Sequence, residues 1–346
     1  MKKFFLAAVA LFSTLGFYSC SDDFEVGAPY KNVTFVYGLL NVNDTAHYIR
    51  IQKAFFDENR NALTLAQIAD SSFYSDLQVV IREIGGGNVK NIPLTRVNLI
   101  DEGIIKDSGS FFTSPHYAYK FKDGLNTSYS YRLVISNPSL TLNDSSEISI
   151  VDTANFNVPP AEQNNYFLNF SDTKPVNPVK SYFLCLTPKN AAMIEGKIRF
   201  YWMDKNTVTK QETDRNAEYI FSTGVTTIGS TSIFCTNLSV YYFLQNAIGK
   251  APQNVERYMD SCDLTISVGG ADLLKYFNVA NSADGGLTAD LISPLYTNIA
   301  GENVYGIFSS RTSIVYRNVP LSLPTIDSFR VNPITAGLNI KGVSPK

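Results

Sequence analysis

Side chains able to carry acid–base, nucleophilic or metal chemistry are few in this sequence. Histidine occurs only as His47 and His116, and both lie in strand patterns typical of packed or surface residues. No GxSxG segment presents a serine, no HExxH pair can bind zinc, and no GxxxxGK segment can cradle phosphate. We therefore expect no catalytic residue, no metal site and no cofactor, and interpret the protein as a non-enzyme.

Acidic residues leave one enzymatic alternative open. A hydrolase that uses only carboxylates needs two of them at a set separation in space, which a sequence does not reveal. The segment Asp57–Asn59 begins like a calcium loop. Ala62, however, stands where glycine must turn the chain, and Ile68 where glutamate must close the site. We interpret this segment as a solvated loop.

A pair of neighbouring aromatic residues, Tyr201 and Trp202, suggests stacking on a sugar ring. Trp202 alternates with Ile198 and Phe200, which predicts that its indole faces the core. Tyr201 points to the opposite face of the same strand, so it is our candidate ligand-binding residue.

Two triplets, Asp44-Thr45-Ala46 and Asp152-Thr153-Ala154, resemble the Asp-Ser/Thr-apolar sites of Bacteroidota O-glycosylation. Under this interpretation Thr45 and Thr153 supply the acceptor hydroxyls and must lie on the surface. The alternative is that triplets this short arise by chance.

Three cysteines in the second half of the chain bear on its redox chemistry. They are Cys185, Cys235 and Cys262. An exported compartment permits one disulfide among them, with one cysteine left over. The alternative is that all three are small buried hydrophobes, because Cys185 and Cys235 sit in apolar runs.

The first residues form an export signal. Met1-Lys2-Lys3 precedes an apolar run, Phe4–Phe17, that is shorter than the roughly 20 residues of a membrane-spanning helix. Ser19 and Cys20 then resemble a lipobox, the site cut by the lipoprotein signal peptidase, although the two preceding residues are bulkier than usual. We predict a signal peptide over residues 1–19 and lipid attachment at Cys20. The alternative is an ordinary signal peptide followed by a chance cysteine.

An acidic tether, predicted over residues 20–29, follows the cut. Its polar residues are Ser21, Asp22, Asp23 and Glu25. The cluster resembles the export signal that sends lipoproteins of the Bacteroidota to the outer face of the outer membrane. We therefore predict a lipid-anchored outer-membrane protein that faces the cell exterior. The alternatives are a tether without signal value and an outer-membrane lipoprotein that faces inward.

The composition indicates a β-rich body of two domains. Removing the signal leaves 346 − 19 = 327 residues, which is more than one typical domain. Hydrophobic residues make up 45% and charged residues only 17%, with 20 Tyr and 23 Phe, a composition that favours strands. The net charge of −2 and the lack of a basic block give no electrostatic footprint for nucleic acid.

Alternating apolar residues predict an immunoglobulin-like β-sandwich over residues 30–157. A tyrosine-rich strand, Tyr129–Ser136, follows the turn at Asp123-Gly124-Leu125, as in the tyrosine corner of such sandwiches. Gly85-Gly86-Gly87-Asn88 can supply the positive φ angles of another turn. One half-buried strand face is predicted to hold Val33, Phe35, Tyr37 and Leu39. Further strands are predicted at Leu77–Ile81, Phe111–Phe121 and Glu147–Asp152, and a short helix at Ala62–Ala69.

Val158-Pro159-Pro160-Ala161 predicts the domain boundary, because proline cannot donate to a sheet. Residues 158–346 then form a β-rich domain with one or two inserted helices. The helices are predicted over Leu238–Ile248, capped by Thr236 or Asn237, and from Gly270 to Phe277. The strands are predicted at Tyr182–Leu186, Lys197–Met203, Glu218–Ser222, Asp263–Val268, Val304–Phe308 and Thr312–Tyr316.

Several segments together resemble a Bacteroidota family of outer-membrane lipoproteins of unknown function, often encoded beside TonB-dependent transporters. Besides the lipobox and acidic tether they are Val36–Phe56, Gly124–Ser136 and Tyr296–Arg311. The family's closing stretch is matched by Asn298, Ile299, Gly301, Gly306, Ile307 and Phe308, with Glu302 where a second glycine is common. The resemblance implies a sandwich-like first half, a membrane partner through the lipid and a TonB-dependent transporter as a protein partner. It brings no catalytic residue.

These features lead to three hypotheses. The first is a non-enzymatic binding or accessory subunit of a nutrient-uptake system, anchored at the outer membrane. The second is an adhesin or pilus-type assembly component, which predicts a missing or detachable edge strand near one terminus. The third is the carboxylate hydrolase, which requires a concave site with two carboxyl groups of raised pKa.

Overall fold

The computed structural model of the protein describes residues 33–54, 61–140, 142–158, 166–171, 180–283 and 296–343. Outside these ranges lie the predicted lipid-attachment residue Cys20 and the acidic residues Ser21, Asp22, Asp23 and Glu25. The calcium-like segment Asp57–Asn59 also lies outside them. Within the described ranges, no helix is long and apolar enough to cross a bilayer.

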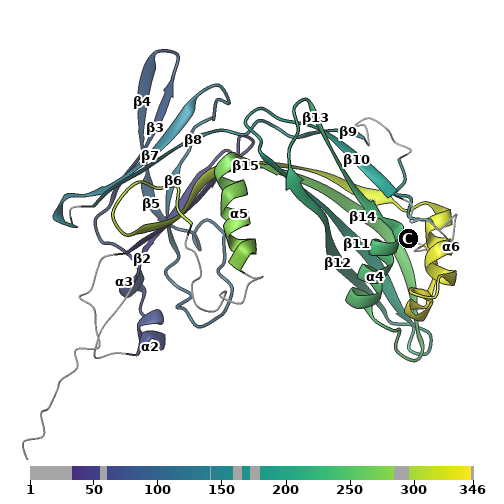
Figure 1. Ribbon diagram of the computed structural model, residues 1–346. Helices are drawn as coiled ribbons and strands as arrows, with labels where there is room; N and C mark the ends of the chain where they lie inside the picture. The colour runs from purple at the N-terminus through teal and green to yellow at the C-terminus, as the bar shows by residue number, and fades with distance from the viewer. Residues whose placement is uncertain are drawn as a thin grey trace, which may run out of the picture.

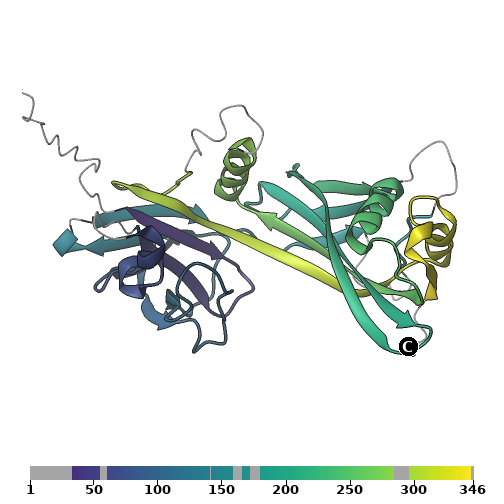
Figure 2. The ribbon, with the colours of Figure 1, turned by 90° about the horizontal axis from the view of Figure 1, so that it is seen from below.

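Two β-rich lobes make up the described chain, and one long strand joins them (Figure 1). The same arrangement is seen from below in Figure 2, where this strand, β15 (Val304–Pro320), runs from one lobe into the other. The expected mainly-β class is confirmed.

The N-terminal lobe stacks two sheets around one core. The first sheet contains the start of β15 and β1 (Thr34–Leu40), β2 (His47–Lys53), β6 (Tyr117–Phe121) and β5 (Thr95–Asn98). The second contains β4 (Asn88–Pro93), β3 (Gln78–Gly85), β7 (Ser130–Asn137) and β8 (Leu142–Ser149). Val36 and Ile49 from the first sheet meet Ile81 and Leu133 from the second in one fully buried cluster.

A buried tyrosine braces the turn before β7. The Tyr131 hydroxyl accepts a hydrogen bond from the backbone N–H of Asn126 at 2.8 Å and donates one to Glu83 at 2.7 Å. This is the backbone contact expected of a tyrosine corner. The residue that makes it is Tyr131, two positions after the start of the predicted strand.

The predicted strand face of Val33, Phe35, Tyr37 and Leu39 is the outer and less buried face of β1. Thr34, Val36 and Leu40 on the opposite face are at most 1% exposed. Apolar residues occur on both faces, because the inner face meets the second sheet and Leu39 on the outer face packs against a small cluster. That cluster consists of Met193, Ile307 and Leu273 of α5 (Ala271–Ala283). Alternation alone therefore did not decide which face is the core.

One strand prediction and one helix prediction also need correction. The predicted strand Phe111–Phe121 is regular only over Tyr117–Phe121, because Pro115 lacks the N–H that a ladder requires. The predicted helix Ala62–Ala69 divides into α2 (Ala62–Ala66) and α3 (Ala69–Ser72).

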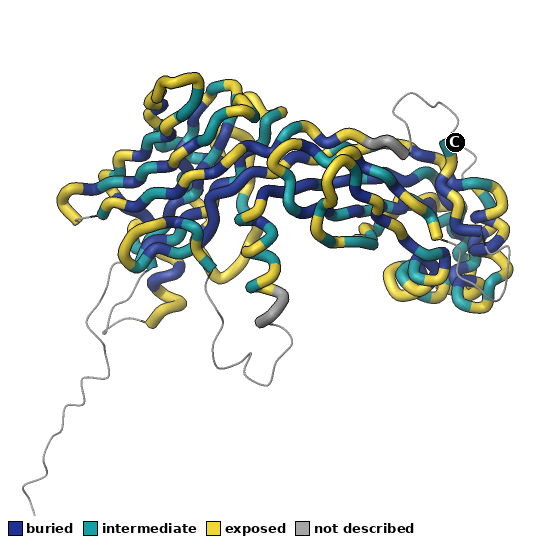
Figure 3. The backbone as a smooth tube through the Cα atoms, turned by 45° about the horizontal axis from the view of Figure 1, so that its top comes forward, coloured by how far each residue is buried: buried dark blue, intermediate teal, exposed yellow. Residues whose placement is uncertain are grey.

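The C-terminal lobe encloses a second core, and Figure 3 shows that buried residues continue through the strands joining the lobes. Its large sheet contains β12 (Glu212–Val225), β11 (Met193–Asn206), β14 (Val255–Gly269), the end of β15 and the short β16 (Ile340–Val343). A small sheet contains β13 (Ser230–Thr236), β10 (Lys180–Leu186) and β9 (Asn155–Val158). The helices are α4 (Asn237–Ile248), α5 and α6 (Leu323–Val331).

Helix α4 closely matches the prediction. Thr236 caps it, because its hydroxyl accepts a hydrogen bond from the N–H of Ser239 at 3.1 Å, and Gly249 ends it with φ of 69°. Tyr241 and Leu244 on its inner face are buried in the core of the C-terminal lobe. Trp202 on β11 is buried there too, as predicted.

Strand β15 replaces two predicted strands with one. Residues 304–310 pair in parallel with β1, and residues 311–320 pair antiparallel with β14. The polar residues Ser309 and Ser310 mark a break in the sequence pattern, yet both are buried. The Ser310 hydroxyl donates to the carbonyl of Ser149 at 2.9 Å and accepts from the N–H of Val151 at 2.8 Å. These bonds satisfy a polar side chain inside a continuous strand.

Gly306 is the point at which β15 meets β1. Its φ is 114°, and a Cβ there would lie 2.0 Å from the carbonyl oxygen of Val36. Asn298 ties the segment before β15 to the strand itself. Its side chain donates to the carbonyl of Phe308 at 2.6 Å and accepts from the N–H of Phe308 at 3.0 Å. Residues of the stretch Asn298–Phe308 thus form the joint at which the C-terminal half of the chain pairs with β1 of the N-terminal lobe.

Gly306→Ala should lower the free energy of unfolding by about 3 kcal/mol or more, because the new methyl group collides with the backbone of β1. Urea unfolding followed by circular dichroism measures the change. Gly224→Ala in β12 is the matched control, since a Cβ there meets no atom within 4 Å. Equal stability of the two variants would contradict this account of the joint.

Candidate functional site

The predicted ligand-binding residue Tyr201 is tied into a polar network. Its hydroxyl donates to the buried carboxylate of Asp263 at 2.9 Å. Asp263 also accepts from the N–H of Asn318 at 3.0 Å and from the Arg317 guanidinium at 3.4 Å. Tyr201 is half-buried. Its hydroxyl therefore braces β11 against β14 and β15.

The two threonines proposed as glycosylation acceptors lie on neighbouring surface segments. Thr45 and Thr153 are both exposed. The Thr153 hydroxyl donates to the side-chain oxygen of Asn43 at 3.0 Å, two residues before Thr45. Surface position fits the role of an acceptor, and glycosylation itself remains a prediction.

The histidines and cysteines occupy packed positions. The His47 ring lies 4.7 Å from the Phe121 ring, centroid to centroid, and burial lowers the pKa of His47. Cys185, Cys235 and Cys262 are buried, and no disulfide joins them to one another, as the hydrophobe alternative expects. Among the described residues, no group of three His, Cys, Asp or Glu side chains could hold a metal ion.

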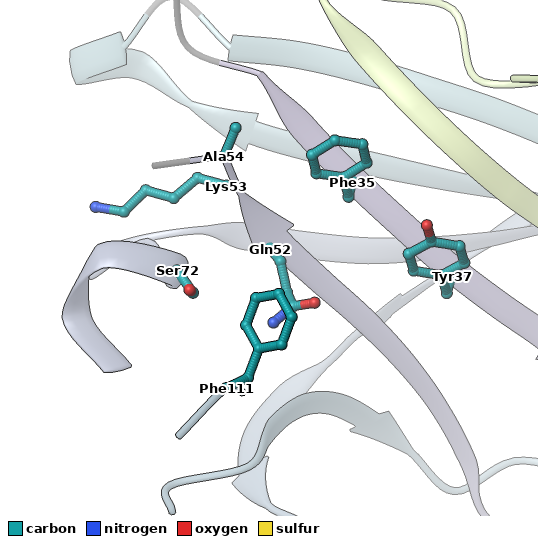
Figure 4. Close-up of a pocket in the computed structure, with 7 residues that line it drawn as sticks. All are labelled: Phe35, Tyr37, Gln52, Lys53, Ala54, Ser72 and Phe111. Atoms are coloured by element: carbon teal, nitrogen blue, oxygen red, sulfur yellow. The ribbon is translucent and has the colours of Figure 1, made fainter. Parts of the chain in front are cut away.

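A cavity that the sequence did not predict lies on the outer face of the first sheet. Its volume is about 370 Å³, within the range of small-molecule sites. Its lining comes from β1, β2, α3 and the loop before β6, and consists of Phe35, Tyr37, Gln52, Lys53, Ala54, Ser72 and Phe111. Figure 4 shows the rings of Phe35 and Tyr37 side by side on one strand, with Phe111 on a separate segment. We call this space the aromatic cavity.

Three basic side chains gather beside the aromatic cavity and form what we call the cationic cluster. They are Arg50 on β2 and Lys106 and His116 on the loop before β6. Burial lowers the pKa of all three, and the charge of Arg50 lowers the pKa of Lys106 and His116 further. The three groups thus lie close enough to repel one another when charged.

No carboxylate among the described residues pairs with the cationic cluster. Lys106 donates to the carbonyl of Phe112 at 2.7 Å. The Nε atom of Arg50 and the Nδ1 atom of His116 are buried without a hydrogen-bond partner in the described chain. The unpaired Nε donor of Arg50 and the like charges of the cluster both cost free energy, so the cluster is a place where a bound anion would stabilise the protein.

Arg257, a buried charge of the C-terminal lobe, is compensated by several acceptors. Arg257 is only 5% exposed, and it donates to Asp204 at 3.0 Å and to the carbonyls of Gly249 and Leu338 at 2.7 and 3.3 Å. Arg50 has no such set of acceptors among the residues that the structure describes. The sequence places Arg50 on the polar face of a predicted strand. In the structure its cross-strand neighbour on β1 is Tyr37, not an acidic residue.

A polar cavity of about 410 Å³ lies between the lobes and bears on the hydrolase hypothesis. Glu147 and Asp272 both line it. Hydrogen bonds from Ser130 and Arg132, however, lower the pKa of Glu147. The pair of carboxyl groups with raised pKa that this hypothesis requires is therefore not present in this cavity.

Among the residues that the structure describes, Asp144 on β8 is the carboxyl group with a raised pKa. Burial raises it to about 6, and its Oδ2 atom finds no hydrogen-bond partner among the described residues. The side chain is 2% exposed and lies against Gly301, where an added Cβ would come within 1.9 Å of Oδ1. Its position inside the N-terminal lobe gives it a role in stability.

Arg50→Met should raise the free energy of unfolding by about 1 kcal/mol, because the fold loses a partly buried charge whose Nε has no acceptor among the described residues, while keeping the apolar stem. Arg257→Met is the matched control and should lower the same quantity by about 3 kcal/mol, since its buried partners lose their donor. Urea unfolding of both variants measures the difference. A loss of stability in Arg50→Met as large as in Arg257→Met would show that Arg50 is an ordinary structural residue.

Asp144 predicts a pH-dependent part of the stability. Its folded pKa of about 6 lies above 3.8, the usual value of an aspartate side chain, so the folded state holds the proton more tightly. The stabilisation is complete below about pH 4 and is lost as the pH rises to about 6. Relative to the native chain, Asp144→Asn should gain about 2 kcal/mol in unfolding free energy between pH 4 and pH 7.

Urea unfolding of the native chain and of Asp144→Asn at both pH values measures this gain. Asp327→Asn, a surface substitution on α6, controls for the change of net charge. A constant difference between Asp144→Asn and the native chain across this range would refute the prediction.

Comparison with known proteins leaves the family of this chain open. No protein-family model matches it, and no curated protein does. Among solved structures it is similar to the C-terminal globular domain of an oligosaccharyltransferase from Pyrococcus abyssi, with 7% identity and a TM-score of 0.23. The match covers 63% of this chain and spans 44% of that one. A second match, to CBD12 from CALX1.2, has 8% identity and a TM-score of 0.16, and covers 80% of this chain and 98% of that one.

Proposed function

We propose that this protein is a lipid-anchored, non-enzymatic binding subunit of a nutrient-uptake system in the outer membrane. The observation that carries the proposal is the export signal that ends at Cys20. Lipid chains on this residue would hold the folded lobes at a membrane surface outside the cytosol, since two or more chains anchor stably. The acidic residues Asp22, Asp23 and Glu25 support display on the cell exterior.

The fold is consistent with binding close to the anchor. Strand β1 begins at Thr34, soon after Cys20 in the sequence, and its residues Phe35 and Tyr37 line the aromatic cavity. The site therefore lies on the lobe that follows the tether directly. We also propose that this lobe belongs to the immunoglobulin-like class, which the two stacked sheets and the contact of Tyr131 with Asn126 support.

The adhesin or pilus-type hypothesis has one supporting observation. Strand β16 is four residues long, lies near the C-terminus and pairs with β14 in parallel. A short terminal strand of this kind is a candidate for exchange between subunits. Strand β1, by contrast, is paired on both sides, with β2 and β15. We prefer the binding subunit because the cavity offers it a site.

Cys20→Ser should release the protein from the membrane fraction, because the thiol that carries the lipid is lost. Membrane flotation and mass spectrometry of the N-terminal peptide measure attachment and acylation. Ser21→Ala is the control and should stay attached. Retention of Cys20→Ser in the membrane, together with an unacylated native peptide, would overturn the anchor.

The same cells test the partner and the orientation. Protease treatment of intact cells should cleave the native protein, and capture from solubilised outer membrane should co-purify a TonB-dependent transporter. Replacing Asp22, Asp23 and Glu25 by their amides should protect the protein from the protease while leaving it acylated. Capture without any transporter would count against the uptake function and leave the anchor standing.

A further inference from the structure

The cationic cluster adjoins the aromatic cavity, since Lys106 and Arg50 lie beside residues of the cavity lining. The Lys106 ammonium lies 5.5 Å from the centroid of the Phe111 ring, and Phe111 lines the cavity. Arg50 is the cross-strand partner of Tyr37, which lines the cavity as well. A molecule in the cavity therefore lies near Arg50 and Lys106, neither of which has a carboxylate partner among the described residues.

The lining of the aromatic cavity suits a ligand with a planar apolar ring. Phe35, Tyr37 and Phe111 contribute rings, and Tyr37 and Phe111 remain 42% and 50% exposed. Exposed aromatic side chains around a concavity offer faces and edges on which a planar ring packs. Gln52 and Ser72 add polar groups that can orient such a ring.

The cluster selects a negative charge. A guanidinium pairs with a carboxylate through two parallel hydrogen bonds, and the buried Nε of Arg50 has no acceptor in the described chain. Within that part of the chain, no acidic side chain forms an ion pair with Arg50, Lys106 or His116. An anion is thus the partner that the local charge lacks.

We propose that the aromatic cavity binds a small aromatic carboxylate, with its ring against Phe35, Tyr37 and Phe111 and its carboxylate toward Arg50 and Lys106. The inference deepens the proposed binding function and rests on it for its biological setting. Binding forms and breaks no covalent bond, so the ligand leaves unchanged.

Calorimetric titration of the full mature chain tests this, with Cys20→Ser introduced so that no detergent is needed. The probes are 2-naphthoate and its neutral analogue 2-naphthamide, which share the ring and differ in charge. The native cavity should bind the acid about 10-fold or more tightly than the amide. Arg50→Met should remove that preference and leave the affinity for the amide unchanged.

Two variants separate the wall from the charge. Phe111→Ala should weaken both probes by a similar factor of about 5 to 10, because it removes ring contact and no charge. Arg199→Met, on the exposed face of β11 and paired with Glu218, should change neither affinity. Thermal unfolding of each variant confirms that it is folded before titration.

Equal affinity of the native chain for acid and amide overturns the proposal, and so does no binding of the acid at about 1 mM. Displacement of 2-naphthoate by an equal concentration of inorganic phosphate also overturns it, because the ring would then be irrelevant. Membrane flotation and transporter capture do not involve the cavity. If the protein is anchored but does not bind 2-naphthoate, only the proposed ligand class is rejected. If it binds 2-naphthoate but is not anchored, only the proposed membrane setting is rejected.

Discussion

The parallel pairing of β15 with β1 is the constraint on which the rest of the structure depends. A strand from near the C-terminus inserts beside the first strand of the N-terminal lobe, so that lobe cannot complete its sheet without residues 304–310. The backbones approach so closely at Gly306 and Val36 that only glycine fits. Because β15 continues without a break into the sheet of the C-terminal lobe, the same strand sets how the two lobes are joined.

This constraint also places the candidate site. With β1 held between β2 and β15, its inner residues Val36 and Leu40 fill the core, and its outer residues Phe35 and Tyr37 face the aromatic cavity. Alternation along a strand forces this division, since successive side chains point to opposite faces. The core and the binding surface are thus two sides of one strand, and a shift of register by one residue would exchange them.

The treatment of charge differs between the framework and the site. Arg257 and Asp263 in the C-terminal lobe are buried and satisfied by several partners, which is the ordinary condition of buried charge. Arg50 is partly buried, and its Nε has no acceptor among the described residues. A local loss of folding free energy of this kind is typical of ligand-binding surfaces. A site whose charges are already fully paired within the protein gains little free energy from binding a ligand.

Local structure was readable from the sequence alone: the caps of α4 at Thr236 and Gly249, and the inward indole of Trp202. Each depends on residues a few positions apart, whose geometry the backbone dictates. The export signal before Cys20 stays a prediction. The continuity of β15 and the meeting of Arg50 with Lys106 and His116 were decided by tertiary structure. These contacts join positions tens to hundreds of residues apart, and only strand pairing and loop packing set which of them meet.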